Sequence, residues 1–383
     1  MKLLHTSDLH IGKRVNEFSM IEDQEYILRE MLKIVDKHKP EAFIIAGDIY
    51  DKSIPGVEAV SLFDWFLTEL HIRKLLVLIV SGNHDSSERI DYGGKIMEDN
   101  NIHIAGTYKG QLQKVTVSDE FGSINFYLMP FIKPATIRKF YPDIEIETYQ
   151  EAAEAIIDNS DIDASERNIL VAHQFITSSG KEPERSESEL ISLGGLDNID
   201  VTVFDIFDYV ALGHIHGPQR IGRDTVRYAG SPLKYSFSES RHNKSITMID
   251  MEKKGIVSFE KIPLIPLRDM REIKGPIEML IDPSIYSQAN TLDYIHGIIT
   301  NEEEIYDGIG IIRSVYPNVM RLDFENSRTI RNDSTSMAAV EVEKKSSMEL
   351  FEEFYENQNN SPMSDVKRNI MTQLFEEMAG EGL

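Results

Sequence analysis

Short apolar runs that end in polar side chains recur along the first half of the chain. The run at 75–80 holds six apolar residues, half of them β-branched, which is typical of a strand buried on both faces. It breaks near Gly82, and Asn83, His84 and Asp85 follow. Open α/β sheets bind ligands at the carboxyl ends of their strands, so this pattern predicts a site. A polar turn is the alternative interpretation of this stretch alone.

Four other predicted strands end in the same way. The strands are 2–6, 42–46, 168–172 and 209–213, and the side chains that follow them are Asp8, His10, Asp48, His173, His214 and His216. Taken singly, an aspartate after a strand is often a turn former or a helix cap, and His214 with His216 could be an exposed strand pair. Five strand ends together favour one polar site.

Helical patterns separate the early strands. Predicted helices at 22–38 and 57–70 alternate with the first three strands, which is typical of a parallel sheet with helices on its faces. Short strands are expected between 103 and 131 and a helix at 145–158. Hairpin-like strands are expected at 225–228, 245–250 and 255–261, and the charged, serine-rich segment 180–188 is predicted to be an exposed loop over the site.

The last third of the chain has a different organisation. Three prolines near 267–275 indicate a domain boundary, which divides a first domain, 1–268, from a small α+β unit, 269–328, with expected strands at 278–281 and 319–324. A polar linker is predicted at 329–345 and a helical segment at 346–383. Two apolar stripes in that segment predict a docking surface, with a fold back onto the small domain as the alternative; they contain Phe351, Phe354, Tyr355, Val366, Ile370, Leu374 and Met378.

Composition narrows the class of protein. The 383 residues include no cysteine, so there is no disulfide framework and no thiolate zinc site. The absence of a signal-peptide pattern and of a membrane-length apolar run predicts a soluble, cytoplasmic protein. The formal net charge of −24 disfavours a nucleic-acid binder but does not exclude one, because bound cations or a partner chain can supply positive charge.

The residue types at the strand ends suit divalent cations. Oxygen and imidazole ligands without sulfur are typical of Mn²⁺, Fe²⁺ or Zn²⁺ sites. Two cations about 3.5–4 Å apart, the separation used for phosphoryl displacement, need a bridging carboxylate. Asp48 is the expected bridge, since its strand is predicted to lie between the other two early strands. The remaining histidines, such as His38, His71 and His103, are expected to be surface or structural residues.

The complete set of motifs resembles that of the calcineurin-like binuclear metallophosphoesterases. The matching stretches are Asp8-Leu9-His10, Gly47-Asp48, Gly82-Asn83-His84-Asp85 and Gly213-His214-Ile215-His216, with His173 before the last. Finer motifs resemble the SbcD family, the nuclease subunits of bacterial SbcCD complexes. These are the stretches 5–12, 85–89, 228–232 and Phe237-Ser238-Glu239.

The resemblance implies a four-layer α/β/β/α sandwich with a small α+β capping domain and a helical C-terminal tail. It also implies two divalent cations, most readily Mn²⁺, and divides the ligands into two sets: Asp8, His10, Asp48 and His216 for one cation, and Asp48, Asn83, His173 and His214 for the other. His84 is then left over and is assigned as the general acid that protonates or polarises the leaving oxygen. Asp85 is expected to orient His84 or, preferably, to cap the following helix.

By the same resemblance the protein is a DNA nuclease, an exonuclease with 3′→5′ polarity on duplex ends and an endonuclease on single strands and hairpins. The implied partner is the SMC-like ATPase SbcC, in a heterotetramer with a nuclease homodimer at the nucleoid. Candidate DNA contacts are Lys13, Arg14, Arg89, Lys133, Arg138, Lys139, Lys234 and Arg241. The alternatives are a metallophosphoesterase for small or protein-borne phosphates, and an inactive interaction protein. Asp51-Lys52 stands where some archaeal relatives carry an auxiliary histidine.

Overall fold

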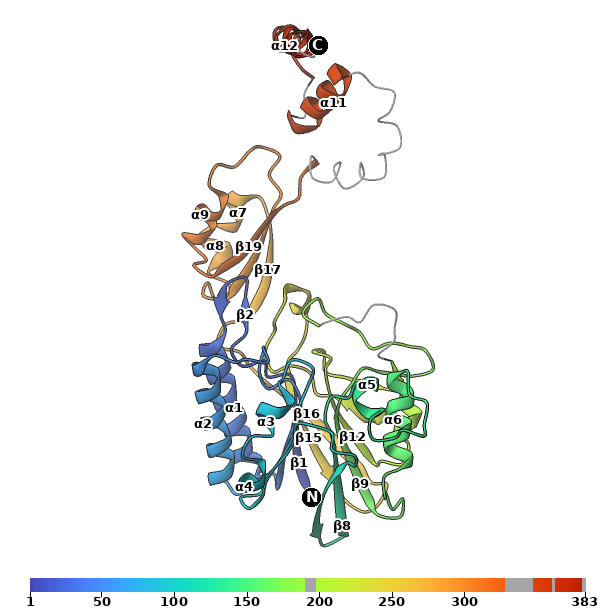
Figure 1. The fold of residues 1–383 in the computed structure, drawn as a ribbon. Coiled ribbons are helices and arrows are strands. Elements are labelled where there is room, and N and C mark those ends of the chain that lie inside the picture. The colour runs from blue at the N-terminus through green and yellow to red at the C-terminus, as the bar shows by residue number, and fades with distance from the viewer. Residues whose placement is uncertain (190–197, 328–346, 360–361, 381–383) are drawn as a thin grey trace. The chain divides into compact units, whose positions relative to one another are not determined.

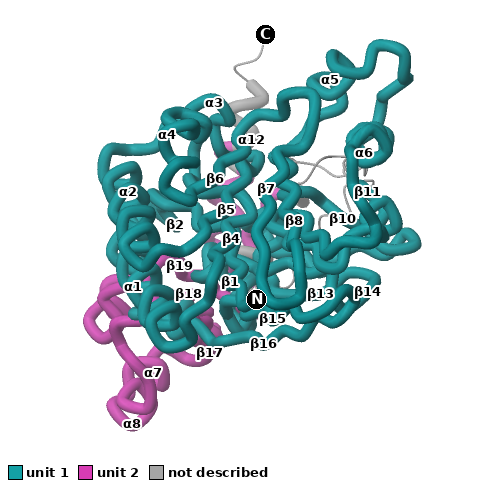
Figure 2. The backbone as a smooth tube through the Cα atoms, turned by 90° about the horizontal axis from the view of Figure 1, so that it is seen from below, with its two compact units in different colours: residues 1–270 teal, residues 271–383 magenta. Residues whose placement is uncertain are grey.

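The computed structural model describes residues 1–189, 198–327, 347–359 and 362–380. The chain divides into two compact units, Met1–Met270 and Arg271–Leu383 (Figure 2). The linker predicted at 329–345 lies outside the described residues.

The first unit contains two six-stranded sheets. The first sheet has the order β16-β15-β1-β4-β5-β6. Strands β1, β4, β5 and β6 run parallel, β15 is antiparallel to β1, and β16 is antiparallel to β15. Its strands are β1 (Lys2–Thr6), β4 (Ala42–Ala46), β5 (Leu76–Val80), β6 (Ile102–Ala105), β15 (Ser245–Met251) and β16 (Val257–Pro263). The parallel register places the ends of β1, β4 and β5 side by side at one edge.

The second sheet has the order β13-β14-β12-β9-β8-β7. Its four central strands β8, β9, β12 and β14 are parallel, and the outer strands β7 and β13 are antiparallel to their neighbours. The bounds are β7 (Gln113–Asp119), β8 (Gly122–Met129), β9 (Arg167–His173), β12 (Tyr209–Gly213), β13 (Gln219–Ile221) and β14 (Arg223–Tyr228). The register pairs Gly213 with His173, so β9 and β12 also end together.

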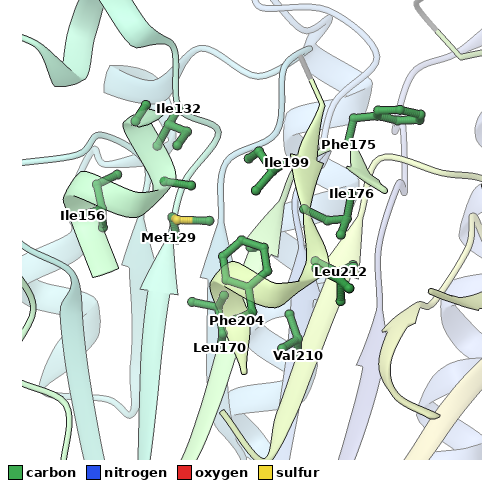
Figure 3. Close-up of a cluster of buried hydrophobic side chains, with 14 of the residues drawn as sticks. Met129, Ile132, Ile156, Leu170, Phe175, Ile176, Ile199, Phe204, Val210 and Leu212 are labelled. Carbon is green, nitrogen blue, oxygen red and sulfur yellow. The ribbon is translucent and has the colours of Figure 1, made fainter. Parts of the chain in front are cut away.

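Helices cover the two outer faces of this pair of sheets. Helices α1 (Ile21–His38) and α2 (Val57–Ile72) flank the first sheet, and α6 (Tyr149–Asp158) flanks the second (Figure 1). Alternation along β9 explains the layering: Ile169 and Val171 belong to the core between the sheets, while Leu170 and Ala172 belong to the core under α6 (Figure 3). The predicted four-layer α/β/β/α sandwich is confirmed.

Short elements complete the first unit. They are β2 (Arg14–Val15), β3 (Phe18–Ser19), α3 (Ser87–Ile90), α4 (Gly94–Glu98), α5 (Pro134–Ile137), β10 (Ile176–Thr177), β11 (Ile199–Asp200), η1 (Val201–Phe204) and η2 (Phe237–Glu239). Most are single turns in the loops around the sheets.

Helix α6 begins four residues later than predicted from the acidic stretch. Thr148 is its N-cap, and its hydroxyl accepts the N–H of Glu151 at 3.2 Å. The Glu151 carboxylate in turn accepts the Thr148 N–H at 2.9 Å, which completes a capping box. The Thr-x-x-Glu motif of the capping box is visible in the sequence. It predicts the first residue of the helix more accurately than the acidic stretch does.

The second unit has a three-stranded sheet, β17 (Met270–Gly275), β18 (Tyr294–Ile299) and β19 (Val319–Phe324), with helices α7 (Ile277–Leu280), α8 (Pro283–Tyr286) and α9 (Gly308–Arg313). The prediction of a strand at 278–281 is wrong, because this stretch forms most of helix α7. Ile277 and Leu280 both face the core of the unit. The Asn301 side chain accepts the Ile277 N–H at 2.8 Å, so a partner distant in sequence satisfies the first turn.

Two helices, α11 (Ser347–Asn359) and α12 (Asp365–Gly380), form the predicted helical tail (Figure 1). Phe351, Tyr355 and Ile370 line an apolar cavity of about 160 Å³ between them. Other stripe residues stay exposed, by 59% for Phe354, 71% for Val366 and 46% for Leu374. The side chain of Met378 is outside the described residues.

Within the described part of the chain, no helix is both long and apolar enough to cross a membrane.

Candidate metal centre

Both sheets deliver their polar side chains to one place. Asp8 and His10 follow β1, Asp48 follows β4 and Asn83 follows β5. The second sheet contributes the residues at and beyond the ends of β9 and β12, which are His173, His214 and His216. Hydrogen bonds cross between these groups, such as that from the His214 N–H to Asp8 Oδ1 at 3.0 Å. The structure therefore brings all seven predicted ligands together.

The backbone at these strand ends is strained. Asp8, His10, Asp48 and His214 have positive φ angles of 53°, 45°, 50° and 99°. Positive φ is uncommon for residues other than glycine, although aspartate and histidine adopt it more often than most, and such conformations persist where the surrounding structure holds them. Four of the seven predicted ligands share this feature, which is typical of a functional site.

Two glycines allow the chains to approach each other at the site. A Cβ on Gly82 would lie 2.1 Å from Asp48 Oδ1, and a Cβ on Gly213 would lie 1.8 Å from the Ala46 carbonyl oxygen. Any larger residue would push these loops apart. This explains why glycine directly precedes Asn83 and His214 in the two motifs.

One flank of the centre is formed by Asp48, Asn83, His173 and His214. Asn83 Oδ1 lies 3.1 Å from His173 Nε2 and 2.9 Å from His214 Nδ1. His173 donates from Nδ1 to the Ala46 carbonyl at 2.8 Å, which leaves Nε2 facing Asp48 Oδ2 at 3.3 Å. Asn83 Oδ1 thus lies within hydrogen-bond distance of both imidazoles, and one of these, His173, also approaches Asp48.

The other flank is formed by Asp8, His10 and His216. The Nε2 atoms of His10 and His216 face each other at 3.1 Å, and His10 Nε2 lies 3.7 Å from Asp48 Oδ2. His10 is buried, and its Nδ1 is without a hydrogen-bond partner. An N–H on one of these Nε2 atoms can donate to the other, and a divalent cation held by both Nε2 atoms would replace that hydrogen bond.

Divalent cations fit this donor set. Among the described residues, three overlapping groups each bring their ligand atoms within 4.8 Å of one another. The groups are Asp8, His10 and His216; His10, Asp48 and His84; and Asp8, Asp48 and His173. Asp48 lies between His10 on one flank and His173 on the other. This is the position that a bridging carboxylate needs.

Burial and neighbouring charges shift the pKa values of these groups. Burial opposes a charge on His173, but the ionised Asp48 beside it outweighs this effect and raises the pKa of His173 to about 9. Burial and the adjacent His173 lower the pKa of His214 to about 3. Burial also raises the pKa of Asp8. Since metal ligands must be deprotonated, cation binding at this flank competes with the proton on His173.

His84 lies at the rim of the centre. Its Nδ1 donates to the Asp51 carbonyl at 2.9 Å, and its ring contacts the His10 ring edge-on with centroids 4.7 Å apart. The other ring nitrogen of His84, Nε2, takes no part in this hydrogen bond. Geometry alone also admits His84 as a ligand, because it belongs to the group with His10 and Asp48. Asp51 thus supports His84 through its backbone carbonyl.

Asp85 has neither of the roles expected for it. Its carboxylate accepts the backbone N–H groups of Ile49 at 3.1 Å, Tyr50 at 3.0 Å and Gly82 at 2.9 Å. It therefore ties the loop after β4 to the loop after β5, and helix α3 begins at Ser86 without a side-chain cap. Burial and the charge of Asp48 raise the pKa of Asp85 to about 6.

Several candidate DNA contacts are engaged within the protein. Lys13 Nζ lies 2.7 Å from Asp51, Lys234 Nζ lies 2.8 Å from Asp269, and Arg138 donates to the Ile146 carbonyl at 2.9 Å. The exposed candidates are Arg14, Arg89, Lys133, Lys139 and Arg241, and Arg138 is exposed as well despite its hydrogen bond.

Sequence reasoning missed a cation close to the centre. The guanidinium of Arg185 stacks on Phe175, with its Cζ 4.0 Å from the ring centroid, and the Phe175 ring lies edge-on to His214 at 6.2 Å. It also missed Ser188 and Glu189, and it named Glu239 only as part of a family motif without a role. All three contact His216. Ser188 and Glu189 fall in or beside the segment predicted to be an exposed loop, but Ser186 and Glu189 are buried.

The fold and the site define a calcineurin-like phosphoesterase, an enzyme of the hydrolase class. A model of that family, described as calcineurin-like phosphoesterase, matches residues 1–218, and one described as type 5 capsule protein repressor C-terminal domain matches residues 266–359. The chain is 34% identical over 378 residues to the SbcD component of nuclease SbcCD from Staphylococcus epidermidis, and the match covers 98% of both chains. The chain therefore belongs to the SbcD family.

Solved structures show more distant likeness. A dimetal phosphatase from Danio rerio is 11% identical with a TM-score of 0.41, over 69% of this chain and 96% of that one. The phosphopantetheinyl hydrolase of Mycobacterium tuberculosis is 15% identical with a TM-score of 0.35, over 60% and 90%. Because these TM-scores are low, the assignment of the chain to its family rests on the family model and on the relative from Staphylococcus epidermidis.

Proposed function

We propose that the protein is the Mn²⁺-dependent DNA nuclease component of an SbcCD-type complex. In this proposal it degrades duplex ends from 3′ to 5′, cuts single strands and hairpins, and serves DNA repair, recombination and replication at the nucleoid. The observation that carries the proposal is the position of Asp48 between two convergent ligand sets, in a chain 34% identical over its length to the SbcD component of a nuclease SbcCD.

The proposed roles of the residues combine the ligand sets that the family resemblance implies with the contacts around His84. Asp8, His10, Asp48 and His216 would hold one cation, and Asp48, Asn83, His173 and His214 the other. Bound cations supply Lewis-acid polarisation of the phosphoryl oxygens. His84 is the proposed general acid: its Nδ1 bond to the Asp51 carbonyl fixes the ring, and the ring protonated on both nitrogens would donate from Nε2 to the leaving oxygen.

The exposed cations are the proposed contacts to the DNA backbone. Arg185 is added to Arg14, Arg89, Lys133, Lys139 and Arg241 in this role. It is partly buried and paired with Glu182 at 2.8 Å, but its guanidinium stacks on Phe175, whose ring contacts that of His214. A local positive surface of this kind can act within an acidic chain, since phosphate contacts are short-ranged in physiological salt.

A nuclease assay tests the substrate. Single-stranded and hairpin DNA are incubated with Mn²⁺, Mg²⁺ or chelator, at about 50 and about 200 mM salt, beside a small phosphodiester. We expect DNA cleavage with Mn²⁺ that falls as salt rises, while hydrolysis of the small ester changes much less. Equal salt responses would favour the alternative function, hydrolysis of a small or protein-borne phosphate ester, which the net charge of −24 mildly supports.

The helical tail is the proposed dock for the ATPase SbcC, within a heterotetramer that contains a nuclease homodimer. Exposed apolar residues on short helices, such as Val366 and Phe354, are typical of a binding surface. Truncation after Lys345 should leave Mn²⁺-dependent cleavage of single-stranded DNA nearly intact and abolish co-purification with SbcC. Unchanged affinity for SbcC would show that the dock lies elsewhere.

A further inference from the structure

Four polar residues without a role in the proposed reaction converge on His216. Ser188 and Glu189 come from the loop after β10, and Glu239 and Lys244 come from the segment between β14 and β15. Glu239 is the last residue of the Phe-Ser-Glu motif that resembles the SbcD family. All four contact a single predicted metal ligand or each other.

His216 is held at three points. Its backbone N–H donates to Glu189 Oε1 at 2.7 Å, and its backbone carbonyl accepts from Lys244 Nζ at 2.9 Å. Its ring Nδ1 lies 2.9 Å from Ser188 Oγ and 3.3 Å from Glu239 Oε1. These contacts fix both the backbone and the plane of the imidazole.

The direction of the hydrogen bonds fixes the tautomer of His216. A carboxylate only accepts, so Ser188 donates its hydroxyl proton to Glu239 Oε1, at 2.5 Å. The Ser188 oxygen is then the acceptor for an N–H at His216 Nδ1. The neutral ring consequently carries its lone pair on Nε2, the atom that faces His10 at 3.1 Å.

Lys244 completes a closed ring of contacts. Its ammonium group donates to Glu239 Oε2 at 2.5 Å, to Ser231 Oγ at 2.8 Å and to the His216 carbonyl, so all three donors are used. Glu239 is fully buried and Lys244 is 6% exposed. A buried ion pair is costly to desolvate and adds little net stability. The desolvation cost of the Lys244–Glu239 pair is explained if the pair positions His216 in the candidate metal centre.

His173, on the other flank, is oriented without any such network. Its Nδ1 donates to a backbone carbonyl, that of Ala46. The sheet itself therefore orients His173, whereas side chains from two loops orient His216. A substitution in those loops can change one flank of the centre and spare the other.

We propose that Glu239, acting through Ser188 and with Lys244 as its counter-ion, is the positioning residue that presents His216 Nε2 to one of the two cations. The inference rests on the proposed two-cation function and extends it: the Glu239 network sets the affinity of one cation site. Outer contacts of this kind typically change metal affinity by about 10–100-fold.

The test compares Mn²⁺ binding by the full-length wild type, Ser188→Ala and Glu239→Gln proteins by titration calorimetry. In the variants we expect one of two binding events to weaken about 10–100-fold and the other to stay unchanged. Excess Mn²⁺ should restore kcat, which a misfolded site would not allow. Glu187→Gln is the matched control, because this exposed residue of the same loop should leave both events unchanged.

A second variant covers the case in which Glu239→Gln fails to fold because Lys244 is left unpaired. The double variant Glu239→Gln with Lys244→Met removes both charges and should show the same selective weakening. Two wild-type-like binding events in Ser188→Ala and in the double variant would overturn the positioning role alone. A wild-type protein that binds no divalent cation would overturn the proposed function as well.

Discussion

Two polar clusters lie at opposite ends of strand β9, and they differ in whether the protein satisfies them by itself. At one end Arg167 is 2% exposed, and its guanidinium donates to Asp119 at 2.5 and 3.1 Å and to the carbonyls of Gly122, Ser123 and Glu252. These contacts use all of its N–H groups. The N-terminal amine adds an ion pair to Asp119 at 3.2 Å.

At the other end His173 enters the candidate metal centre. There the strand ends carry positive φ angles, two imidazole nitrogens face each other at 3.1 Å, and Asp48 lies between histidines on both flanks. The Arg167 cluster is complete as a piece of structure. The candidate metal centre instead gathers ligand atoms that divalent cations fit. The comparison distinguishes buried charge that stabilises the fold from buried charge in a pattern typical of a functional site.

The largest effect is expected from Asp48→Ala, which removes the carboxylate between the two flanks. This variant should lose bound metal and fall to background cleavage. Mn²⁺ at about 100 times its Kd should stabilise the wild type by about 2.7 kcal/mol but should leave the Tm of the variant unchanged. Elemental analysis and thermal melts measure both quantities. Full metal occupancy in Asp48→Ala would contradict the bridging role.

His84→Ala should separate acid from ligand at the same centre. We expect near-full metal occupancy with a rate lowered about 10²–10⁴-fold, the usual contribution of a general acid. The metal content of the purified variant decides the assignment. An empty site would make His84 a ligand, as its group with His10 and Asp48 geometrically permits.

Asp119→Ala should break the opposite cluster and spare the metal centre. It leaves the buried Arg167 guanidinium short of its carboxylate, and we expect the free energy of unfolding to fall by about 3 kcal/mol, the lower end for broken buried pairs. Denaturant titration measures this loss. Metal content and kcat should match the wild type, and a loss of metal would show that the two ends are coupled.

The smallest effect concerns pH. The hydrogen bonds from Arg167 hold the pKa of Asp119 below its ordinary value of 3.8. The folded state therefore binds this proton more weakly than the unfolded chain, so the stabilisation is present above pH about 4 and is lost as the pH falls further. Urea titrations between about pH 6 and pH 3 on the metal-free protein should show a shallower loss for Asp119→Asn than for the wild type. Parallel curves would refute this linkage.

The local patterns of the sequence determined the parallel sheet with helices on its faces and the set of candidate ligands, whereas the four-layer sandwich was implied by the family resemblance. Each signal is local: an apolar run buried on both faces, a glycine and then a polar residue, as at Gly82-Asn83 and Gly213-His214. Parallel pairing then places such ends at one edge because the register of the strands leaves no other arrangement.

The tertiary structure decided what depends on distant partners. Helix α7 forms where a strand was predicted because Asn301 satisfies its first turn, and Asp85 joins two loops instead of capping a helix. The contacts of His216 with Ser188 and Glu239 likewise join loops far apart in the sequence. A buried polar group must find a partner, but the local pattern shows only the need for one. The packing of the whole chain determines which residue becomes that partner.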